Sequence, residues 1–411
     1  MAGKNKDFSR REFLFRAFSG MASVGLFGVS GEALSLYNQE KITQDSNKKI
    51  LYRTLGKTGI RVPIVNMGVM NSLDPALVKK SYEIGVRHFD TAAYYMQGRN
   101  EEMLGKAIKE LNVRDKVIIG TKIYIPPQQR GMSPDKVKET YLNIAEKSLK
   151  RLQTDYVDIL YSHSVQTIEW LNNPGIREAL QLLKEQGKVR FIGFSTHSNM
   201  AKCINEAVRT GFYDVILTAF NYAMADDKNL IDALRKAASK GIGLIAMKTQ
   251  CTQYWYRQYV PEASQKYYKG KIMHTAVLKW ALRNDFITTA VPGYTTFQQM
   301  EEDFSVAYGL EYTSEEKKFL QDRNVKFLLG YCRQCNRCVS SCPKGVDIPT
   351  LMRIHMYVTC YSNLYQARDT LNSIPKGKDL QACISCDTCR ASCVNHIDIP
   401  KRIDELKTIY V

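Results

Sequence analysis

Residues 157–162 read Val-Asp-Ile-Leu-Tyr-Ser, residues 190–195 read Arg-Phe-Ile-Gly-Phe-Ser, and an amphipathic stretch, Ile176–Gln186, lies between them. The two outer runs are short and hydrophobic, as strands are, whereas the middle stretch has helical spacing of its apolar residues. The pattern therefore predicts two parallel strands that are joined by a crossover helix.

The same alternation recurs from about residue 50 to residue 325. The other strand candidates are Val62–Val69, Arg87–Asp90, Val117–Lys122, Val215–Phe220, Gly243–Lys248 and Ile287–Val291. Further helix candidates are Pro134–Leu152 and Asn229–Lys240. Eight strands that alternate with helices predict an α/β fold, a (β/α)8 TIM barrel. No strong G-x-G-x-x-G motif follows a strand, which argues against a Rossmann domain.

Polar residues stand where the predicted strands end, the face of such a barrel that carries chemistry. Asp90 ends the second strand, Tyr95 follows in the next loop, Lys122 ends the third strand and His163 follows the fourth. We expect these four side chains to converge and to deliver a proton to a carbonyl oxygen. In this hypothesis Lys122 lowers the pKa of Tyr95, Asp90 holds Lys122 and His163 orients the substrate oxygen, while a cofactor supplies the hydride.

Several motifs resemble those of the aldo-keto reductase family over roughly residues 50–310. They are YRTLGKTG at 52–59, HFDTAAYY at 88–95, Asn100-Glu101, Thr121-Lys122 and DILYSH at 158–163. The resemblance implies that Tyr95 is the proton donor, that Lys122 and Asp90 tune it, and that His163 positions the carbonyl. Tyr94 is a neighbouring candidate for the donor that the spacing favours less.

The resemblance also implies a nicotinamide cofactor bound without a Rossmann fold. The positions that it assigns to this cofactor are Ser195, Thr196, Met247, Gly293, Tyr294, Thr295, Thr296, Glu302 and Asp303. Two cations that many family members place on the 2′-phosphate are replaced here by Gly293 and Gln299. Because a phosphate clamp without cations is weak, NADP and NAD both stay open.

Eight of the eleven cysteines stand near the C-terminus in two copies of the spacing C-x2-C-x2-C-x3-C. The copies are Cys332, Cys335, Cys338, Cys342 and Cys383, Cys386, Cys389, Cys393. This run holds [4Fe–4S] clusters in two-cluster ferredoxins, where the fourth cysteine usually binds the other cluster. We therefore predict two [4Fe–4S] clusters, one on Cys332, Cys335, Cys338 and Cys393 and one on Cys383, Cys386, Cys389 and Cys342. Zinc and disulfides are the weaker alternatives.

The residues between the two cysteine runs have helical patterns at Pro349–Tyr361 and Ser362–Leu371. They predict a small α-helical domain of ferredoxin type at 326–411, after a barrel at 50–325. Two clusters with interleaved ligands suit an electron relay better than a purely structural staple.

Lys and Arg outnumber Asp and Glu by 58 to 41, which gives a formal net charge of +17. The positive residues are spread along the chain, so nucleic-acid binding has little support, and an acidic one-electron carrier or an anionic substrate is favoured. No stretch of eighteen apolar residues occurs, so no membrane span is expected.

The N-terminus contains Ser9-Arg10-Arg11-Glu12-Phe13-Leu14 before a mildly apolar stretch. It resembles a twin-arginine export signal, predicted at 1–33 and followed by a linker at 34–49. A protein that acquires clusters in the cytoplasm has to leave it folded, which this route permits. We therefore expect a periplasmic or exported protein, with a cytoplasmic location as the alternative.

The leading hypothesis is an oxidoreductase that interconverts a carbonyl and an alcohol, on a sugar-like small molecule, and passes electrons through the clusters. The alternatives are a redox-responsive regulatory protein on a reductase-like barrel and a plain NAD(P)H-dependent reductase with structural clusters. An aromatic and basic segment at Tyr254–Lys269 is either a sugar-stacking element or a packed lid. Substrate identity, direction, electron partner and oligomeric state stay open.

Overall fold

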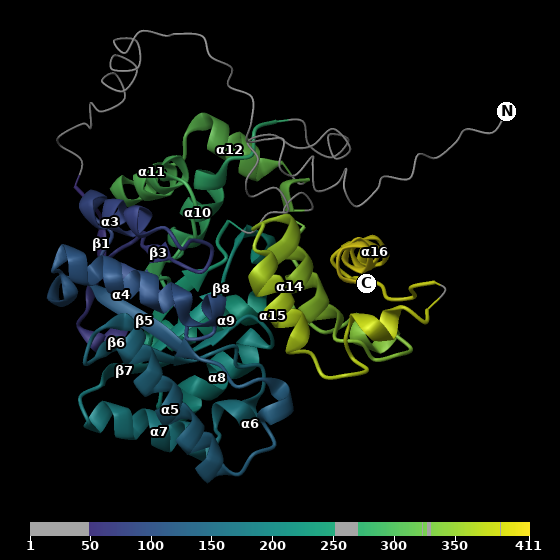
Figure 1. Ribbon diagram of the computed structural model, residues 1–411. Coiled ribbons are helices and arrows are strands. Elements are labelled where there is room, and N and C mark those ends of the chain that lie inside the picture. Colours follow the sequence, from purple (N-terminus) through teal and green to yellow (C-terminus); the bar gives the residue numbers. More distant parts are fainter. Residues whose placement is uncertain (1–48, 251–269, 323, 327–329, 387) are drawn as a thin grey trace, which may run out of the picture. The chain divides into compact units, whose positions relative to one another are not determined.

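The computed structural model describes residues 49–250, 270–322, 324–326, 330–386 and 388–411, and Ile50 to Val411 form one compact unit. Eight parallel strands lie in sequence order around a barrel (Figure 1). They are β3 (Met67–Gly68), β4 (His88–Asp90), β5 (Ile118–Ile123), β6 (Val157–Ser162), β7 (Val189–Thr196), β8 (Val215–Ala219), β9 (Gly243–Met247) and β10 (Thr289–Ala290). A parallel bridge between Val65 and Ala290 joins the first and last strands. The predicted (β/α)8 barrel is confirmed.

Helices follow the strands as the alternating pattern predicts. They are α3 (Pro75–Ile84), α4 (Arg99–Leu111), α5 (Pro134–Leu152), α6 (Ile168–Leu171), α7 (Pro174–Glu185), α8 (Met200–Thr210), α9 (Lys228–Ser239), α10 (His274–Leu282), α11 (Phe297–Ser305) and α12 (Ser314–Gln321). The start of α5 shows why the boundary was predictable, because the Ser133 hydroxyl accepts a hydrogen bond from the Lys136 amide and Pro134 fills the first helical position.

The first predicted strand, Val62–Val69, is wrong as a single element. Its first part is β2 (Arg61–Pro63), which pairs with β1 (Tyr52–Thr54) in an antiparallel hairpin, and only its second part, β3, enters the barrel. The hairpin carries Leu55, Ile60 and Val62 into a cluster with residues of β6, β8 and β9 inside the barrel. The hydrophobic run is continuous because β2 and β3 are both buried, although β2 pairs with β1 and β3 pairs with β4.

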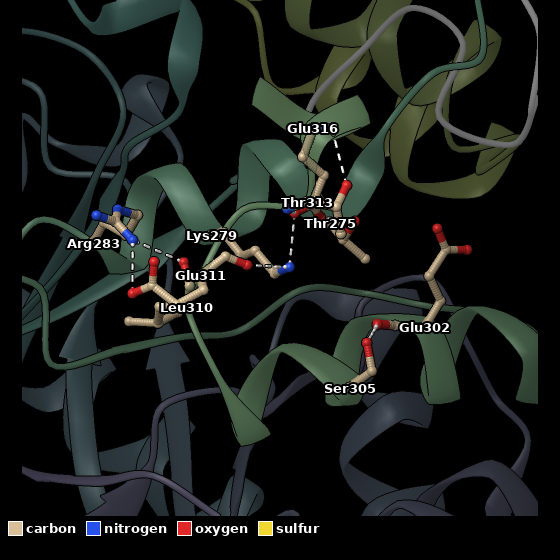
Figure 2. A network of polar contacts seen from close by, with 9 residues as sticks. All are labelled: Thr275, Lys279, Arg283, Glu302, Ser305, Leu310, Glu311, Thr313 and Glu316. Carbon is tan, nitrogen blue, oxygen red and sulfur yellow. Dashed lines mark hydrogen bonds and ion pairs between the residues drawn. The ribbon is translucent and has the colours of Figure 1, made fainter. Parts of the chain in front are cut away.

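A polar network ties α10 to α12 near the end of the barrel (Figure 2). The Glu316 carboxylate accepts a hydrogen bond of 2.6 Å from the Thr275 hydroxyl and lies 2.8 Å from the Lys279 ammonium. Thr313 and Glu316 also form a reciprocal capping box at the start of α12. These contacts explain why a carboxylate that is 2 % exposed is tolerated there.

The C-terminal region is helical, as predicted, and no strand occurs in residues 330–386 and 388–411. It contains α14 (Ile348–Thr359), α15 (Leu364–Asn372) and α16 (Ile399–Tyr410). Ile348 to Tyr357 of α14 are buried without a break, because the helix packs on α15, on α16 and on the barrel. No helix in the described ranges combines the length and the apolar character that a bilayer crossing requires.

Several predictions fall outside the described residues. They are the signal at 1–33, all of the linker at 34–49 except Lys49, and the aromatic segment at Tyr254–Lys269. These stay predictions.

Candidate active site

Three of the four predicted catalytic residues form one contact group at the mouth of the barrel. The Lys122 ammonium lies 2.5 Å from an Asp90 carboxylate oxygen and donates a second hydrogen bond of 2.5 Å to the Thr91 carbonyl. It also lies 3.4 Å from the Tyr95 hydroxyl. β4 and β5 are adjacent and in register, so their carboxyl ends bring these groups together. No contact between Lys122 and the Tyr94 hydroxyl exists among the described residues, so the geometry favours Tyr95 as the donor.

His163 completes the group from the end of β6. Its ring stands edge-on to the Tyr95 ring, with 5.7 Å between the ring centres. Burial lowers the pKa of His163 well below its ordinary value, and the nearby cations, led by Lys122 and Arg353, lower it further. The imidazole is therefore neutral at pH 7 and can donate a hydrogen bond to a carbonyl oxygen without carrying charge.

Lys122 was expected to lower the pKa of Tyr95, but the surroundings of this phenol raise it. Burial raises the pKa of Tyr95 well above its ordinary value, and Asp90 and Tyr357 raise it further. Lys122 forms an ion pair with Asp90, whose carboxylate lies nearer to the ammonium than the Tyr95 hydroxyl does. The phenol consequently stays protonated, which suits a proton donor rather than a base.

The backbone around this group is strained at several non-glycine residues. Met96 and Gln97, directly after Tyr95, have φ of 49° and 57°, and Ser164, directly after His163, has φ of 56°. Lys248, at the end of β9, has φ of 57°. Left-handed backbone in residues with a Cβ costs free energy and gathers at sites whose side chains have to be aimed.

Asn100 and Glu101 anchor the loop that carries Tyr95. The Asn100 amide donates hydrogen bonds to the carbonyls of Val69, at 2.9 Å, and Ser72, at 2.7 Å. The buried Glu101 carboxylate accepts from the Thr121 hydroxyl at 2.5 Å and from Arg151 at 2.6 Å. These bonds fix the start of α4 against β3 and β5, so the strained loop is held from its far end.

Two hollows meet at Tyr95, Met247 and Lys248. The β3–β10 hollow has an empty volume of about 540 Å³. Its lining consists of Gly68, Met70, Asn71, Asp90, Tyr95, Met247, Lys248, Thr249, Gln250, Val291, Pro292, Gly293 and Tyr361. The mouth hollow has an empty volume of about 470 Å³. Its lining consists of Tyr94, Tyr95, Tyr124, His163, Ser164, His197, Met247, Lys248, Arg353, Tyr357, Gln366, Thr370 and Ser373.

Four of the predicted cofactor residues fall into two groups. Met247 and Gly293 line the β3–β10 hollow. Ser195 and Thr196 are buried and line neither hollow, and their hydroxyls already bond within the protein. The Ser195 hydroxyl accepts from the Ser164 amide at 2.9 Å, and the Thr196 hydroxyl donates to the carbonyl of Val165 at 2.8 Å.

Three further predicted cofactor residues, Tyr294, Thr295 and Thr296, lie around the start of α11. The Thr296 hydroxyl caps that helix by accepting from the Gln299 amide, and the Gln299 side chain accepts from the Thr295 amide at 2.9 Å. Tyr294 is buried, with its hydroxyl 2.8 Å from the Ser81 hydroxyl. Helix starts of this kind present free amides to anions.

Glu302 and Asp303 lie farther along α11. The Glu302 carbonyl accepts a hydrogen bond from Ser305, and its carboxylate makes no contact with the residues drawn (Figure 2). Asp303 is buried and accepts a hydrogen bond of 2.5 Å from the Gln250 amide. Burial raises the pKa of Asp303 to about 7.

The C-terminal region contributes side chains to the mouth hollow that sequence reasoning missed. Arg353 and Tyr357 come from α14, and Gln366 and Thr370 come from α15. Arg353 donates a hydrogen bond of 2.7 Å to His197, which follows β7. No signal in the sequence could have found these residues, because only packing of α14 on a strand end 156 residues away creates the contact.

The first group of predicted cluster ligands lines one hollow. Cys332, Cys335, Cys338 and Cys393 surround it together, although Cys393 is 55 residues beyond Cys338. The turns between the first three cysteines use left-handed backbone at Gln334 and Asn336. The Asn395 amide donates a hydrogen bond to the Cys393 sulfur at 3.3 Å. Backbone amides that point at sulfur stabilise a thiolate.

The second group gathers around Cys383. Burial raises the pKa of this thiol to about 11, and Cys342, Cys389 and Cys386 are near enough to raise it further, while Lys407 lowers it. The same four residues were predicted to share one cluster. None of the ten described cysteines is in a disulfide. Among the described residues, no three His, Cys, Asp or Glu side chains stand close enough together to hold a single metal ion.

Comparison with known proteins identifies the barrel. The sequence model of the aldo/keto reductase family matches residues 71–322. L-galactose dehydrogenase of Arabidopsis thaliana is 30% identical over 303 residues, which are 67% of this chain and 93% of that protein. L-glyceraldehyde 3-phosphate reductase of Escherichia coli is 25% identical over 321 residues, which are 64% of this chain and 90% of that protein.

Solved structures share the fold. An aldo-keto reductase from Bacillus halodurans superposes with a TM-score of 0.54 at 21% identity and covers 66% of this chain and 96% of its own. An aldo/keto reductase from Klebsiella pneumoniae, solved with NADP and acetate, gives a TM-score of 0.51 at 20% identity and covers 68% of this chain and 96% of its own. With the matched residues, the parallel barrel and the polar group at its mouth in hand, we conclude that this chain belongs to the aldo/keto reductase family of oxidoreductases.

Proposed function

We propose that the protein interconverts a carbonyl and an alcohol on a small molecule at the mouth of the barrel, with NADP or NAD as the hydride carrier. The observation that carries the proposal is the Asp90–Lys122–Tyr95 contact group with His163 beside it. The NADP named for the Klebsiella pneumoniae structure supports a nicotinamide cofactor here. Met247, Gly293 and the capped start of α11 would hold this cofactor.

Each residue of the group has a role that its surroundings permit. Tyr95 stays protonated because burial raises its pKa, so its phenol gives a proton to the carbonyl oxygen during reduction. Lys122, held by Asp90, keeps a positive charge near the phenolate that is left. Neutral His163 donates a hydrogen bond to the same oxygen and so fixes its place. When bound, the nicotinamide supplies the hydride for reduction and accepts it in the reverse direction.

The test is turnover with NADPH and NADH on small aldehydes and aldoses by anaerobically purified protein. Tyr95→Phe removes the proton donor and should lower kcat by about 100-fold or more. Tyr94→Phe removes the neighbouring phenol, which has no contact with Lys122 among the described residues, and should retain most of the rate. Equal losses in both variants, or none in Tyr95→Phe, would contradict the assigned donor.

We further propose that the two cysteine groups hold two [4Fe–4S] clusters that exchange electrons with a one-electron carrier. Support comes from the two sets of four cysteines, each drawn from both sequence runs. Each thiolate of such a cluster binds a different iron atom, so its ligands stand farther apart than those of a single ion. The backbone carbonyl of Gln334, between two cysteines of the first run, accepts a hydrogen bond of 3.2 Å from the Ser198 hydroxyl, three residues beyond Ser195. That contact supports coupling between this cysteine loop and the barrel mouth.

Iron and acid-labile sulfide analysis of anaerobic preparations tests the clusters, with eight of each per chain expected for two cubanes (two clusters of four). A redox titration then distinguishes an electron relay from clusters that only stabilise the fold. Clusters whose visible absorbance bleaches when nicotinamide and substrate are both present support the relay. Clusters that keep their oxidation state throughout turnover are structural, and the protein is then a plain nicotinamide-dependent reductase.

Export by the twin-arginine route stays part of the proposal. The basic pair Arg10-Arg11 supports it, together with the need to insert clusters before export. Fractionation of the source cells and the mass of the processed N-terminus test it. An intact N-terminus on cytoplasmic protein would favour the alternative location.

A further inference from the structure

The mouth hollow contains two cationic side chains and no carboxylate. Arg353 and Lys248 both line it, and neither Asp nor Glu occurs among its described lining residues. The same hollow is lined by Tyr95 and His163, which would handle the reacting carbonyl. Two cations and the proton donor therefore line the same hollow.

Arg353 is buried without a compensating negative charge. The residue is 8 % exposed, and its hydrogen bond within the described residues goes to the Nε2 atom of His197, which accepts it at 2.7 Å. His197 is neutral, because burial lowers its pKa well below the ordinary value and Arg353 lowers it further. No ion pair among the described residues includes Arg353. Because a buried charge without a counter-charge is unfavourable, the surroundings of Arg353 favour the binding of an anion.

Lys248 adds a second positive charge to the lining of the hollow. Its ammonium lies 5.2 Å from the centre of the Tyr357 ring and 5.8 Å from that of Tyr361. Its backbone is in the left-handed region at φ of 57°, which fixes the direction of the side chain at the end of β9. Ring faces hold an ammonium in place but do not neutralise it, so Lys248 is also ready for an anion.

Apart from Met247, the other lining residues carry polar, uncharged groups. The Gln366 amide donates weakly to Thr370 at 3.3 Å, while its carbonyl oxygen is buried with no partner in the described structure. The phenols of Tyr94 and Tyr124 stand nearby, with ring centres 5.0 Å apart. Such a lining offers hydrogen bonds to hydroxyl groups, and an unpartnered buried acceptor costs free energy until it receives one.

We propose that the natural substrate is a hydroxylated carbonyl compound with an anionic group, a sugar acid or a sugar phosphate, whose anion is held by Arg353 and Lys248. This inference rests on the proposed carbonyl–alcohol activity and specifies its substrate class. Arg353 is a binding and specificity residue: it gives up no proton and no electron, and its planar fork matches the two oxygens of a carboxylate or phosphate. During reduction the carbonyl carbon gains a hydride from the nicotinamide and the oxygen gains a proton from Tyr95. The anionic group of the substrate does not react and stays bonded to it.

The test compares kcat/KM for two matched pairs, glucuronate against glucose and glyceraldehyde 3-phosphate against glyceraldehyde. Wild-type protein should prefer the anionic member of at least one pair by about tenfold or more, and the preferred pair identifies carboxylate or phosphate. Arg353→Gln should reduce that preference by about tenfold or more, mainly through KM, because a hydrogen-bonded charge is lost. A ratio measured within one variant is insensitive to the fraction of folded protein.

Arg130→Gln is the matched control. Arg130 is a half-buried arginine near enough to interact with Arg353 and His163 electrostatically, but it does not line the hollow. Its removal also lowers the local positive potential but takes no side chain out of the hollow, so it should leave the preference for the anionic substrate as it is. Lys248→Gln is a second test in the event that Arg353→Gln does not fold, and should also reduce the preference.

The outcomes separate this inference from the proposed function. Turnover with no preference for an anionic member, or an unchanged preference in Arg353→Gln, overturns the inference and leaves the activity standing. If no carbonyl compound is turned over, the proposed function fails, and calorimetry with glucuronate and glyceraldehyde 3-phosphate still tests the anion site. Binding to wild-type protein that disappears in Arg353→Gln supports it, and equal binding or none to both proteins overturns it.

Discussion

The mouth of the barrel and the cysteine-rich region both gather reactive side chains, but they do so by different means. At the mouth, adjacent parallel strands bring Asp90 and Lys122 together, and the ladder of backbone hydrogen bonds fixes their register. In the cysteine-rich region the thiols stand mostly in loops, and several of them are partly exposed. The first site is organised by the fold itself, whereas in our proposal the second would depend on its iron–sulfur clusters to complete its geometry.

Burial acts in opposite ways on the two sites. At the mouth it keeps Tyr95 protonated and His163 neutral, the forms in which they donate hydrogen bonds. At the cysteines it raises the pKa of Cys332 to about 12 and that of Cys338 to about 11, so the clusters that we propose would have to displace protons. The comparison teaches that desolvation favours the uncharged form at both sites. This form suits an acid catalyst, but it opposes the thiolate form that a metal ligand needs.

The largest expected effect is that of removing one cluster ligand. Cys332→Ser should lose at least one cluster, about half of the iron, and should loosen α14 and α16 while the barrel strands stay protected. Iron analysis and hydrogen exchange by mass spectrometry measure both effects. Cys203→Ala, a buried cysteine of α8 outside the two runs, is the control and should keep all of the iron. Undiminished protection of α14 and α16 in iron-free protein would show that this region also is organised by its own packing.

Lys122→Met tests the preorganised site. It removes the cation beside Tyr95 and leaves the Asp90 carboxylate buried without its partner. We expect kcat to fall by about 100- to 10,000-fold and the free energy of unfolding to fall by about 3–5 kcal/mol. Lys79→Met, which breaks an exposed pair with Glu110, should change the free energy of unfolding by less than about 1 kcal/mol. Chemical denaturation and steady-state kinetics distinguish the two.

Asp303 makes the stability of the barrel depend on pH. Because burial raises the pKa of this carboxyl from 3.8 to about 7, folding favours its protonated form. Its stabilising contribution is full below about pH 4 and is lost as the pH rises through about 7, at a cost of about 4 kcal/mol. Asp303→Asn should therefore stabilise the protein at pH 8 more than at pH 5. Melting temperatures at the two values check this, and a larger gain at pH 5 would reverse the assigned sign.

The smallest expected effect concerns the link between the two regions. Ser198→Ala removes the hydrogen bond from its hydroxyl to the Gln334 carbonyl and should lower the free energy of unfolding by about 1 kcal/mol. Faster hydrogen exchange in residues 332–342, with unchanged exchange in β7, is the expected signature. Ser305→Ala removes a comparable hydroxyl-to-carbonyl bond within α11 and should leave residues 332–342 unaffected.

Prediction from the sequence succeeded where the signal is local. The strand ends with their polar residues, the bounds of α5 and the helical nature of residues 348–372 all follow from periodicity and capping within one element. It failed at Val62–Val69, where one apolar run serves two elements with different partners. The expected effect on the pKa of Tyr95 also differs, because burial is a property of the assembled site and not of a motif.

The sequence by itself determined the alternation of strands and helices, the four polar residues at the barrel mouth and the spacing of the eight cysteines. These are short-range patterns that each element carries with it. Only the tertiary structure decided that Arg353 of α14 lies against His197 and lines the same hollow as Tyr95. The reason is that the role of a buried cation depends on the residues around it. For Arg353 these residues are distant in sequence and come close only when the C-terminal helices pack on the barrel.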